Sequence, residues 1–362
     1  MPVGRATRCL LFGPGGFIGA RVRTVLAATP DVELLVSARP AVPAERGARP
    51  AGRHRGSDPA GADPVRGEPA DSDVDDGQGG DGDRGGAEPA DAGATAAELA
   101  ASGLATDLAV DGPATVARVI RAAAPDVVIN CAGATYGDPA TMVAGNVVAV
   151  ATLVDAIRSA APTARLVHLG SAAEYGRVTP GRPVTESVRP DPVGAYGITK
   201  LAGTALVGAA GLDAVVLRIF NLIGPGSPPT GLPGRLAGEF RRAAESGDGV
   251  RVGSLEAHRD FVDVRDVAAA VVAAALAPGA LPPILNVGSG VATPLRELAD
   301  ALRTISGVDA PVHEVTAGSA RSADVPWQCA DPAAIGAALG WSATISVPDS
   351  LRDLWHGAAC AV

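Results

Sequence analysis

Short apolar runs, each rich in Val, Leu or Ile, recur along the chain up to residue 220 and predict β-strands. They lie at 8–13, 32–37, 126–133, 165–171 and 212–220. The stretches between them predict helices, from the glycine-rich turn after the first strand to about residue 28 and near 113–124, 138–160 and 195–210. Strands that alternate with helices predict an α/β fold with a doubly wound parallel sheet covered on both faces.

After residue 220 the predicted elements become shorter and the chain becomes richer in Pro and Gly. We therefore expect a larger sheet domain at 1–220 and a smaller lobe at 221–362 that is partly interleaved with it. The segment 41–93 differs from both, since it has many Gly, Pro, Asp and Arg residues and almost no large apolar side chains. Such a composition cannot bury enough surface to offset the entropy of ordering, so we predict a disordered insertion there.

The overall composition narrows the classes of function. The formal net charge is −9, whereas a nucleic-acid surface needs clustered basic residues, so we expect no nucleic-acid partner. No apolar run approaches the ~20 residues of a membrane span, and the N-terminus lacks the layout of a signal peptide, so we expect no membrane partner. The Cys and His residues are scattered without paired spacing, which predicts a cytoplasmic protein without a metal site.

A glycine-rich turn, GPGGFIG at 13–19, follows the first strand and opens the first helix. Glycines at this place let the backbone approach a pyrophosphate, and the N-terminus of the following helix favours an anion. We therefore interpret the sheet domain as a Rossmann-type dinucleotide-binding domain. The residues of the turn that we expect to bind the cofactor are Gly13, Gly16, Phe17, Ile18 and Gly19.

The end of the second strand distinguishes the two nicotinamide cofactors, because an acid there binds the ribose hydroxyls of NAD and a base accommodates the 2′-phosphate of NADP. The strand ends in LLVSARP, with Arg39 in that place and no acid. We therefore predict NADP(H) as the cofactor, with NAD as the alternative.

Two further segments are expected to line the cofactor site. Asp107 and Leu108 would lie beside the adenine ring, because Asp111 is the better candidate to cap the helix that starts near residue 113. In the motif NCAG, small residues that include Ala132 would lie where the cofactor crosses the edge of the sheet.

Of the 30 Lys and Arg residues, only Lys200 is a lysine. Tyr196 precedes it by four residues in a predicted helix, which places the phenol and the ammonium on one face, one turn apart. The ammonium favours the phenolate form, so the pair is suited to proton transfer. Ser171 ends a predicted strand at the carboxyl edge of the sheet, where its hydroxyl can hydrogen-bond a substrate oxygen.

Several motifs in order resemble the extended short-chain dehydrogenase/reductases, the group of nucleotide-sugar epimerases, dehydratases and reductases. The resemblance covers nearly all of the chain except the insertion. It rests on GPGGFIG, NCAG, GSAAEYG, AYGITK, LRIFNLIGPG, RDFVDVRDVA, LNVGSG and a C-terminal R-x-x-D…AD…LGW pattern. It implies a catalytic triad of Ser171, Tyr196 and Lys200, in which Lys200 also binds the cofactor.

The same resemblance implies a nucleotide-sugar substrate. Asn221 would face it, and Arg259 and Arg321 would bind its diphosphate, because arginine forks match phosphate geometry. Arg259 could instead pair with Asp263 or Asp266. The resemblance also implies a homodimer formed by the predicted helices at 138–160 and 195–210, which are rich in small residues.

Within the group, the segment 252–266, the motif FNLIGPG and Arg39 most resemble GDP-4-keto-6-deoxymannose reductases and their GDP-mannose dehydratase relatives. The dehydratases carry an acid two residues after the catalytic hydroxyl, where this chain has Ala173, and Glu174 follows one place later. We therefore expect NADPH-dependent reduction of the C4 keto group of a nucleotide-linked 4-keto-6-deoxyhexose. The alternative is a nucleotide-sugar 4-epimerase with tightly bound NAD, and a catalytically silent cofactor-binding protein is a third reading.

Overall fold

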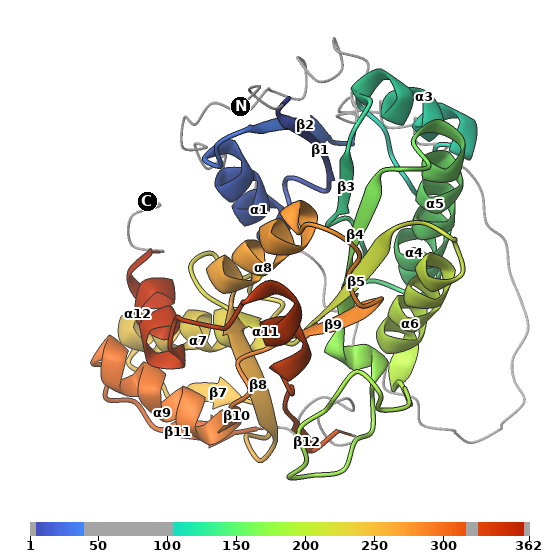
Figure 1. Cartoon of the computed structure of the whole chain (residues 1–362). Helices are drawn as coiled ribbons and strands as arrows, with labels where there is room; N and C mark the ends of the chain where they lie inside the picture. The colour runs from blue at the N-terminus through green and yellow to red at the C-terminus, as the bar shows by residue number, and fades with distance from the viewer. Residues whose placement is uncertain (1–4, 40–103, 316–324, 358–362) are drawn as a thin grey trace, which may run out of the picture. The chain divides into compact units, whose positions relative to one another are not determined.

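A parallel sheet organises the residues that the computed structural model describes, which are 5–39, 104–315 and 325–357. The predicted insertion at 41–93 lies outside the described residues. In sheet order the six strands are β2 (Val32–Ser37), β1 (Thr7–Phe12), β3 (Val127–Asn130), β4 (Arg165–Ser171), β5 (Ala214–Ile219) and β9 (Ile284–Val287) (Figure 1). Every strand predicted from the apolar runs is present.

Helices cover both faces of this sheet (Figure 1). One face packs against α1 (Phe17–Ala27), α8 (Val264–Leu276) and α11 (Ala333–Leu339). The other packs against α3 (Pro113–Ala123), α5 (Ala149–Ala160) and α6 (Gly194–Gly208). The predicted Rossmann-type, doubly wound α/β fold is therefore confirmed.

The central strands bury both of their faces, which explains why they read as continuous apolar runs. In β1, Cys9 and Leu11 belong to the core on the α1 side, whereas Leu10 and Phe12 belong to the core on the α3 side. Since β1 lies between β2 and β3, the direction of winding changes between β1 and β3. Ligands of such folds bind outside the carboxyl ends of the strands at this switch point.

The predicted helix at 138–160 consists of α4 (Pro139–Val143), a π-helical turn η1 (Ala144–Val148) and α5. Among the described residues, this stretch alone is long and apolar enough to cross a membrane by length and composition, with a hydropathy of 1.7. The expectation that no apolar run approaches that length is therefore wrong. Core helices meet the same criteria, and α5 packs against α3 and α6 in the sheet domain.

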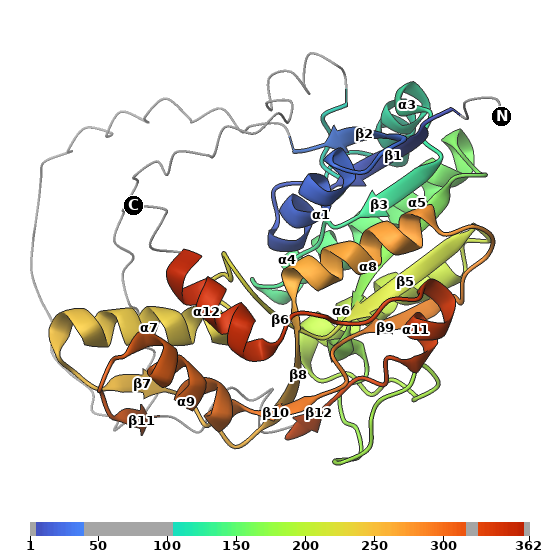
Figure 2. The same ribbon diagram turned by 60° about the vertical axis from the view of Figure 1, so that its left-hand side comes forward.

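The chain after residue 220 contributes to two regions (Figure 2). β9, α8 and α11 belong to the large sheet and its cover. A second sheet contains β6 (Asn221–Ile223), β8 (His258–Asp263), β10 (Ala292–Pro294) and β12 (Trp327–Gln328), and β7 (Val250–Val252) pairs with β11 (Val312–Glu314). Helices α7 (Leu232–Ser246), α9 (Leu295–Ser306) and α12 (Val347–Gly357) complete a separate apolar core.

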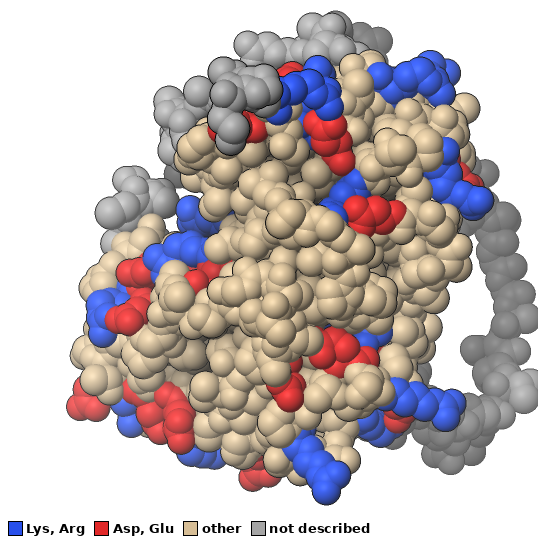
Figure 3. All heavy atoms as spheres, viewed as in Figure 1, with Lys and Arg blue, Asp and Glu red and all other residues tan. Residues whose placement is uncertain are grey.

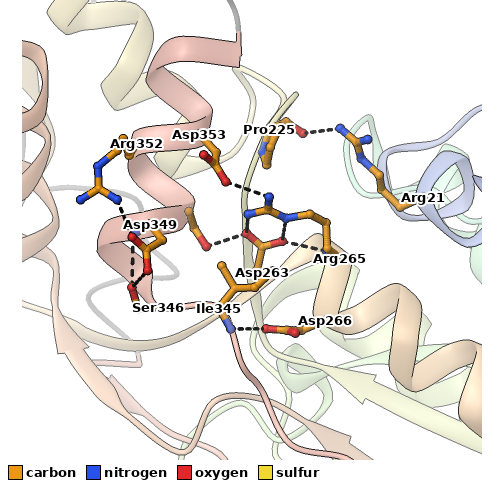
Figure 4. A network of polar contacts seen from close by, with 11 residues as sticks. Arg21, Pro225, Asp263, Arg265, Asp266, Ile345, Ser346, Asp349, Arg352 and Asp353 are labelled. Atoms are coloured by element: carbon orange, nitrogen blue, oxygen red, sulfur yellow. Dashed lines mark hydrogen bonds and ion pairs between the residues drawn. The ribbon is translucent and has the colours of Figure 1, made fainter. Parts of the chain in front are cut away.

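A polar network fastens α12 to the junction of β8 and α8 (Figure 4). Asp263 caps α8, binds the Arg265 guanidinium through both oxygens at 2.8 and 2.9 Å, and accepts a hydrogen bond from Ser350. Arg265 also pairs with Asp353 at 2.7 Å. Burial opposes ionisation of Asp263, but the hydrogen bonds from Arg265 and Ser350 hold its pKa below the usual value.

Charged side chains of both signs are intermingled on the face shown in Figure 3. Exposed ion pairs occur among the described residues, such as Arg177 with Asp191 at 3.6 Å. Exposed pairs of this kind contribute little to stability, so the fold depends mainly on its apolar cores.

Candidate active site

The glycine turn after β1 has a conformation and packing that exclude side chains at two positions. Gly13 has a φ of +74°, and a Cβ there would lie 2.6 Å from the backbone nitrogen of Ala132. A Cβ at Gly19 would lie 2.0 Å from the Gly13 carbonyl oxygen. Gly16 is the N-cap of α1 and donates a hydrogen bond to the Gly13 oxygen at 3.3 Å.

Phe17 and Ile18 form the first turn of α1. The Ile18 side chain packs against the core beneath the sheet, and the Phe17 ring lies 3.9 Å from the Cβ position of Gly226. Since the first N–H groups of a helix lack partners within the helix, these residues can offer backbone donors to an anion. Their role in binding a cofactor remains a prediction.

A cavity of ≈360 Å³ opens beside this turn at the switch point between β1 and β3. Its lining includes six of the residues predicted to bind the cofactor, which are Gly13, Gly16, Arg39, Asp107, Leu108 and Ala132. The cavity therefore gathers the glycine turn, the end of β2, the segment around residue 107 and the exit of β3.

Arg39 and Asp107 contact each other at the mouth of the cavity. The Arg39 Nε lies 3.1 Å from the Asp107 carboxylate, and the Arg39 side chain is 73% exposed. Asp111 does not cap α3, whose N-cap is Gly112, so that expectation is wrong. Its carboxylate instead accepts a hydrogen bond from the Asp107 backbone at 2.7 Å and one from the Thr106 hydroxyl, which fixes the segment that carries Asp107.

Helix α6 packs on the end of β4. A Cβ at Gly197 would lie 2.5 Å from the carbonyl oxygen of Ala173, in the 3₁₀ turn (Ala172–Glu174) that follows Ser171. Tyr196 is the neighbour of Gly197 and is half-buried. The structure thus brings the helix that carries Tyr196 against the turn that follows Ser171.

Lys200 is buried between α6 and β4, beside the cavity. Its Nζ donates a hydrogen bond to the Leu169 carbonyl oxygen at 2.5 Å and lies 3.9 Å from the Cβ position of Gly133, which lines the cavity. Burial lowers the pKa of Lys200 to about 8, and the negative charge of Glu174 opposes this shift. A lysine in this place is a compact cation next to the expected position of the cofactor.

Asn146 is a polar residue of the site that the sequence analysis missed. It lies in η1, where its side chain accepts a hydrogen bond from the Ala134 N–H at 2.9 Å and donates to the Ala134 oxygen and to Thr199 of α6. π-Helical turns often mark functional sites, and this one ties the exit of β3 to the helix that carries Lys200. The only signal in the sequence is an Asn inside an otherwise apolar helix.

A second pair that the sequence analysis did not assign lies beneath the cavity. Asn130, at the end of β3, accepts a hydrogen bond from the Ala132 N–H at 3.0 Å and contacts His168 Nδ1 at 3.1 Å. Burial, followed by the charge of Lys200, holds the pKa of His168 well below its usual value, so its ring is neutral. The pair holds the backbone that lines the cavity.

Glu174 does not line the large cavity. It is fully buried, and its carboxylate binds the Ser171 backbone, Thr204 and Arg218. It is therefore unavailable as an acid for a bound sugar, and Ala173 occupies the place where the dehydratases have one.

Of the predicted substrate residues, Arg259 lies where the second sheet meets the turn that follows β4. Arg259, on β8, lines a small cavity of ≈10 Å³ together with Ala173 and Val193, the N-cap of α6. Its Nη1 donates a hydrogen bond to the His258 oxygen at 2.8 Å. The geometry therefore brings Arg259 next to the turn that follows Ser171.

Asn221 begins β6 and donates a hydrogen bond to the Asp260 carbonyl oxygen at 3.0 Å. Arg321 lies outside the described residues. Of the acids considered as partners for Arg259, Asp263 binds Arg265 and Ser350, and Asp266 binds the segment at residues 344–345.

Over the described ranges, no group of three or more His, Cys, Asp or Glu residues is placed to hold a metal ion.

Comparison with known proteins identifies the family. The profile of the NAD dependent epimerase/dehydratase family matches residues 82–288. The chain is 35% identical over 265 residues to a dTDP-6-deoxy-L-talose 4-dehydrogenase (NAD(P)(+)) of Kitasatospora kifunensis, which covers 71% of this chain and 83% of the relative. It is 29% identical over 242 residues to a GDP-6-deoxy-D-mannose reductase of Pseudomonas aeruginosa. This match covers 64% of this chain and 79% of the relative.

Among solved structures, RMD from Pseudomonas aeruginosa complexed with NADPH superposes with a TM-score of 0.71 at 22% identity. The match covers 98% of this chain and 100% of that one, and it supports the fold. The predicted resemblance is confirmed, and so is the expectation of a nicotinamide dinucleotide, NADP(H) or NAD, as cofactor. The chain belongs to the NAD dependent epimerase/dehydratase family and is an NAD(P)-dependent enzyme.

Proposed function

We propose that the protein reduces the C4 keto group of a nucleotide-linked 4-keto-6-deoxyhexose with NADPH. The observation that carries this proposal is the packing of α6 on the end of β4, with Lys200 buried beside the cavity at the switch point. The relatives support the substrate class, because both are named for nucleotide-linked 6-deoxyhexoses and one is named for position 4.

The residues of the large cavity fit a nicotinamide dinucleotide. The absence of side chains at Gly13 and Gly19 allows a pyrophosphate close to the turn, and the amides at the start of α1 can bind it. Arg39 would bind the 2′-phosphate of NADP, and Asp107 and Leu108 would line the adenine end. When bound, the cofactor supplies the hydride that C4 accepts.

The protein's own residues would manage the proton and the orientation of the sugar. Tyr196 would donate its hydroxyl proton to O4, while the Ser171 hydroxyl donates a hydrogen bond to the same oxygen. The Lys200 ammonium would stabilise the phenolate that remains. Arg259 and Arg321 would bind the diphosphate, with Asn221 facing the sugar, so that binding far from C4 positions the reacting atoms.

The direct test follows NADPH oxidation with GDP-, dTDP- and UDP-linked 4-keto-6-deoxy sugars in parallel. We expect one nucleotide series to be consumed, and we expect Tyr196→Phe to lower kcat by about 10²–10⁴-fold without weakening NADPH binding. Tyr136→Phe is the control, because Tyr136 is 52% exposed. Turnover retained by Tyr196→Phe would contradict the assignment.

A 4-epimerase with tightly bound NAD is the second candidate, and the ion pair between Arg39 and Asp107 favours it, since Asp107 offsets the charge that would attract a 2′-phosphate. Protein that purifies with bound NAD and interconverts C4 epimers without net NADPH consumption would support this candidate. No turnover of any sugar, together with normal NADPH binding, would instead support a catalytically silent protein.

We also propose that the enzyme is a cytoplasmic homodimer that pairs through the helices at 138–160 (α4, η1 and α5) and 195–210 (α6). Val143, Val148 and Ile198 on these elements are 44%, 45% and 55% exposed, which is high for large apolar side chains. Light scattering should give a dimer for the wild type and a monomer for Ile198→Asp. A wild-type monomer at working concentration would contradict the proposal.

A further inference from the structure

Glu174 joins three separate segments through its two carboxylate oxygens. Oε1 accepts a hydrogen bond from the Ser171 backbone N–H at 2.8 Å, at the end of β4. Oε2 accepts hydrogen bonds from the Thr204 hydroxyl on α6 at 2.9 Å and from the Arg218 Nε on β5 at 2.8 Å. The side chain has no exposed surface, and its bonds to three elements fix its orientation.

The last residues of β4 are held from two sides. A Cβ at Gly170 would lie 2.7 Å from Glu174 Oε1, so glycine is needed for the carboxylate to fold back over the strand. Lys200 donates to the oxygen of Leu169, the residue before Gly170. Because Thr204 follows Lys200 by one helical turn, Glu174 reaches α6 next to the lysine.

Arg218 is itself fixed, so the carboxylate cannot move with it. Its guanidinium lies 4.4 Å from the centre of the Tyr175 ring, and the Tyr175 hydroxyl donates a hydrogen bond to Asn286 Oδ1 of β9 at 2.7 Å. The ion pair of Glu174 and Arg218 therefore anchors the site to two strands of the large sheet.

We propose that Glu174 is a positioning residue that couples the end of β4, which carries Ser171, to helix α6, which carries Tyr196 and Lys200. It is not a catalytic residue, because its carboxylate is enclosed and does not line the large cavity. Its position one place after Ala173 shows that an acid in this turn can serve the geometry of the site without touching the sugar.

The same carboxylate acts on Lys200 through its charge. The titratable groups that influence the ammonium or respond to it are Glu174 in the turn, Cys131 after β3 and His168 on β4. Of these, His168 is neutral, and burial raises the pKa of Cys131 to about 12, which keeps its thiol protonated at neutral pH. Glu174 is therefore the acid among these groups that keeps the buried lysine charged.

The decisive experiment uses the fact that Lys200 is the only lysine of the chain. Labelling lysine with ¹³C at the ε carbon gives one lysine resonance, whose shift titrates with the Lys200 ammonium in the full-length enzyme. Glu174→Gln should lower the pKa of Lys200 by about one unit or more, because an opposite charge has been removed. Glu174→Asp keeps the charge and should leave that pKa closer to the wild-type value.

Kinetics separate positioning from charge. Glu174→Asp is one methylene shorter and cannot span the same segments, so kcat should fall about 10-fold or more while the KM for the cofactor changes little. Thr204→Val removes only the bond to α6 and should lower kcat without moving the Lys200 titration. Thr152→Val is the matched control, since Thr152 on α5 is 7% exposed and Thr204 is 6% exposed.

The proposal is overturned if a folded Glu174→Gln enzyme gives the wild-type Lys200 titration, or if Glu174→Asp and Thr204→Val both keep the wild-type kcat. Should Glu174→Gln fail to fold, the kcat values of Glu174→Asp and Thr204→Val decide. The inference rests on the proposed roles of Ser171, Tyr196 and Lys200. The titration needs no substrate, so failure to turn over 4-keto sugars would count against the proposed function alone.

Discussion

The glycine turn after β1 and the polar interior around Glu174 are built in opposite ways. The turn is one continuous segment from Gly13 to Gly19, and a Cβ at Gly19 would collide with Gly13 itself. The interior around Glu174 instead joins residues from β4, α6 and β5, which meet only in the folded chain. The first region can be recognised from spacing along the sequence, whereas the second depends on contacts between distant segments.

The largest expected effect is a loss of kcat, and it should come from a substitution in the interior that leaves the glycine turn intact. Lys200→Arg places a larger, planar cation in a buried site where the ammonium donates a hydrogen bond to the Leu169 oxygen. We expect kcat to fall by about 10²-fold or more, because the fork does not fit the space of an ammonium. Steady-state kinetics and NADPH fluorescence titration would measure this.

Dissociation constants for NADPH should change less than kcat in Lys200→Arg. The exposed Arg352→Lys change serves as a control and should leave both quantities unaltered. If Lys200→Arg keeps the wild-type kcat, the interior does not depend on the shape of the Lys200 ammonium, and the contrast with the glycine turn is refuted.

The reciprocal change acts on the turn. Gly19→Ala places a Cβ 2.0 Å from the Gly13 oxygen and should weaken NADPH binding by about 10-fold or more, because the backbone of the turn must shift. Gly238→Ala is the control: it lies within α7 with open space around its Cβ position, and it should stabilise the fold by about 0.5–1 kcal/mol. Urea unfolding and fluorescence titration distinguish the two outcomes, and equal behaviour of both variants would refute the steric account.

A smaller effect on cofactor binding is expected at Arg39 and Asp107, which are proposed to lie beside the adenosine part of the cofactor. Arg39→Gln should weaken NADPH binding by about 10-fold and NADH binding much less, since an exposed Arg contributes mainly through the 2′-phosphate. Asp107→Asn should increase the preference for NADPH, because it frees the charge of Arg39. Unchanged ratios of the two dissociation constants in both variants would exclude a role for the pair in cofactor choice.

A further expected effect concerns the pH dependence of stability. The pKa of Lys200 is about 8 in the fold and 10.5 as the reference value, so the unfolded chain holds more protons between these pH values. The contribution of Lys200 to the free energy of unfolding should therefore rise with pH from about 8 to 10.5. Urea unfolding of the wild type minus that of Lys200→Met isolates this contribution, and a flat difference would contradict the burial of a charged lysine.

Most of the fold could be predicted from sequence because its strands are apolar on both faces and its helices separate them regularly. The glycine turn, Arg39 and Ala132 were placed at one cavity because each follows the carboxyl end of a strand. The π-helical turn was not predictable, since its residues continue the apolar pattern of the helices on either side.

The interior contacts escaped prediction for a different reason. Nothing near Glu174 in the sequence indicates that Arg218 and Thr204 would reach it, and a lone acid in a turn usually lies in solvent. Asp111 was assigned to the cap of α3, but Thr106 and the Asp107 backbone compete for its carboxylate and Gly112 takes the N-cap position. Contacts between distant segments decide the position of Glu174, whereas contacts with residues four and five positions away decide that of Asp111.

One of the two edge strands of the large sheet, β9, comes from residues 284–287 and pairs with β5 from far upstream. In a nascent chain that has emerged only to residue 220, β5 would have an unpaired hydrogen-bonding edge. The face of the sheet that α8 later covers would be exposed to solvent. Cooperative folding must then wait until the ribosome has delivered most of the polypeptide. Truncations between residues 220 and 290 should accordingly yield insoluble material rather than an autonomous dinucleotide-binding fragment.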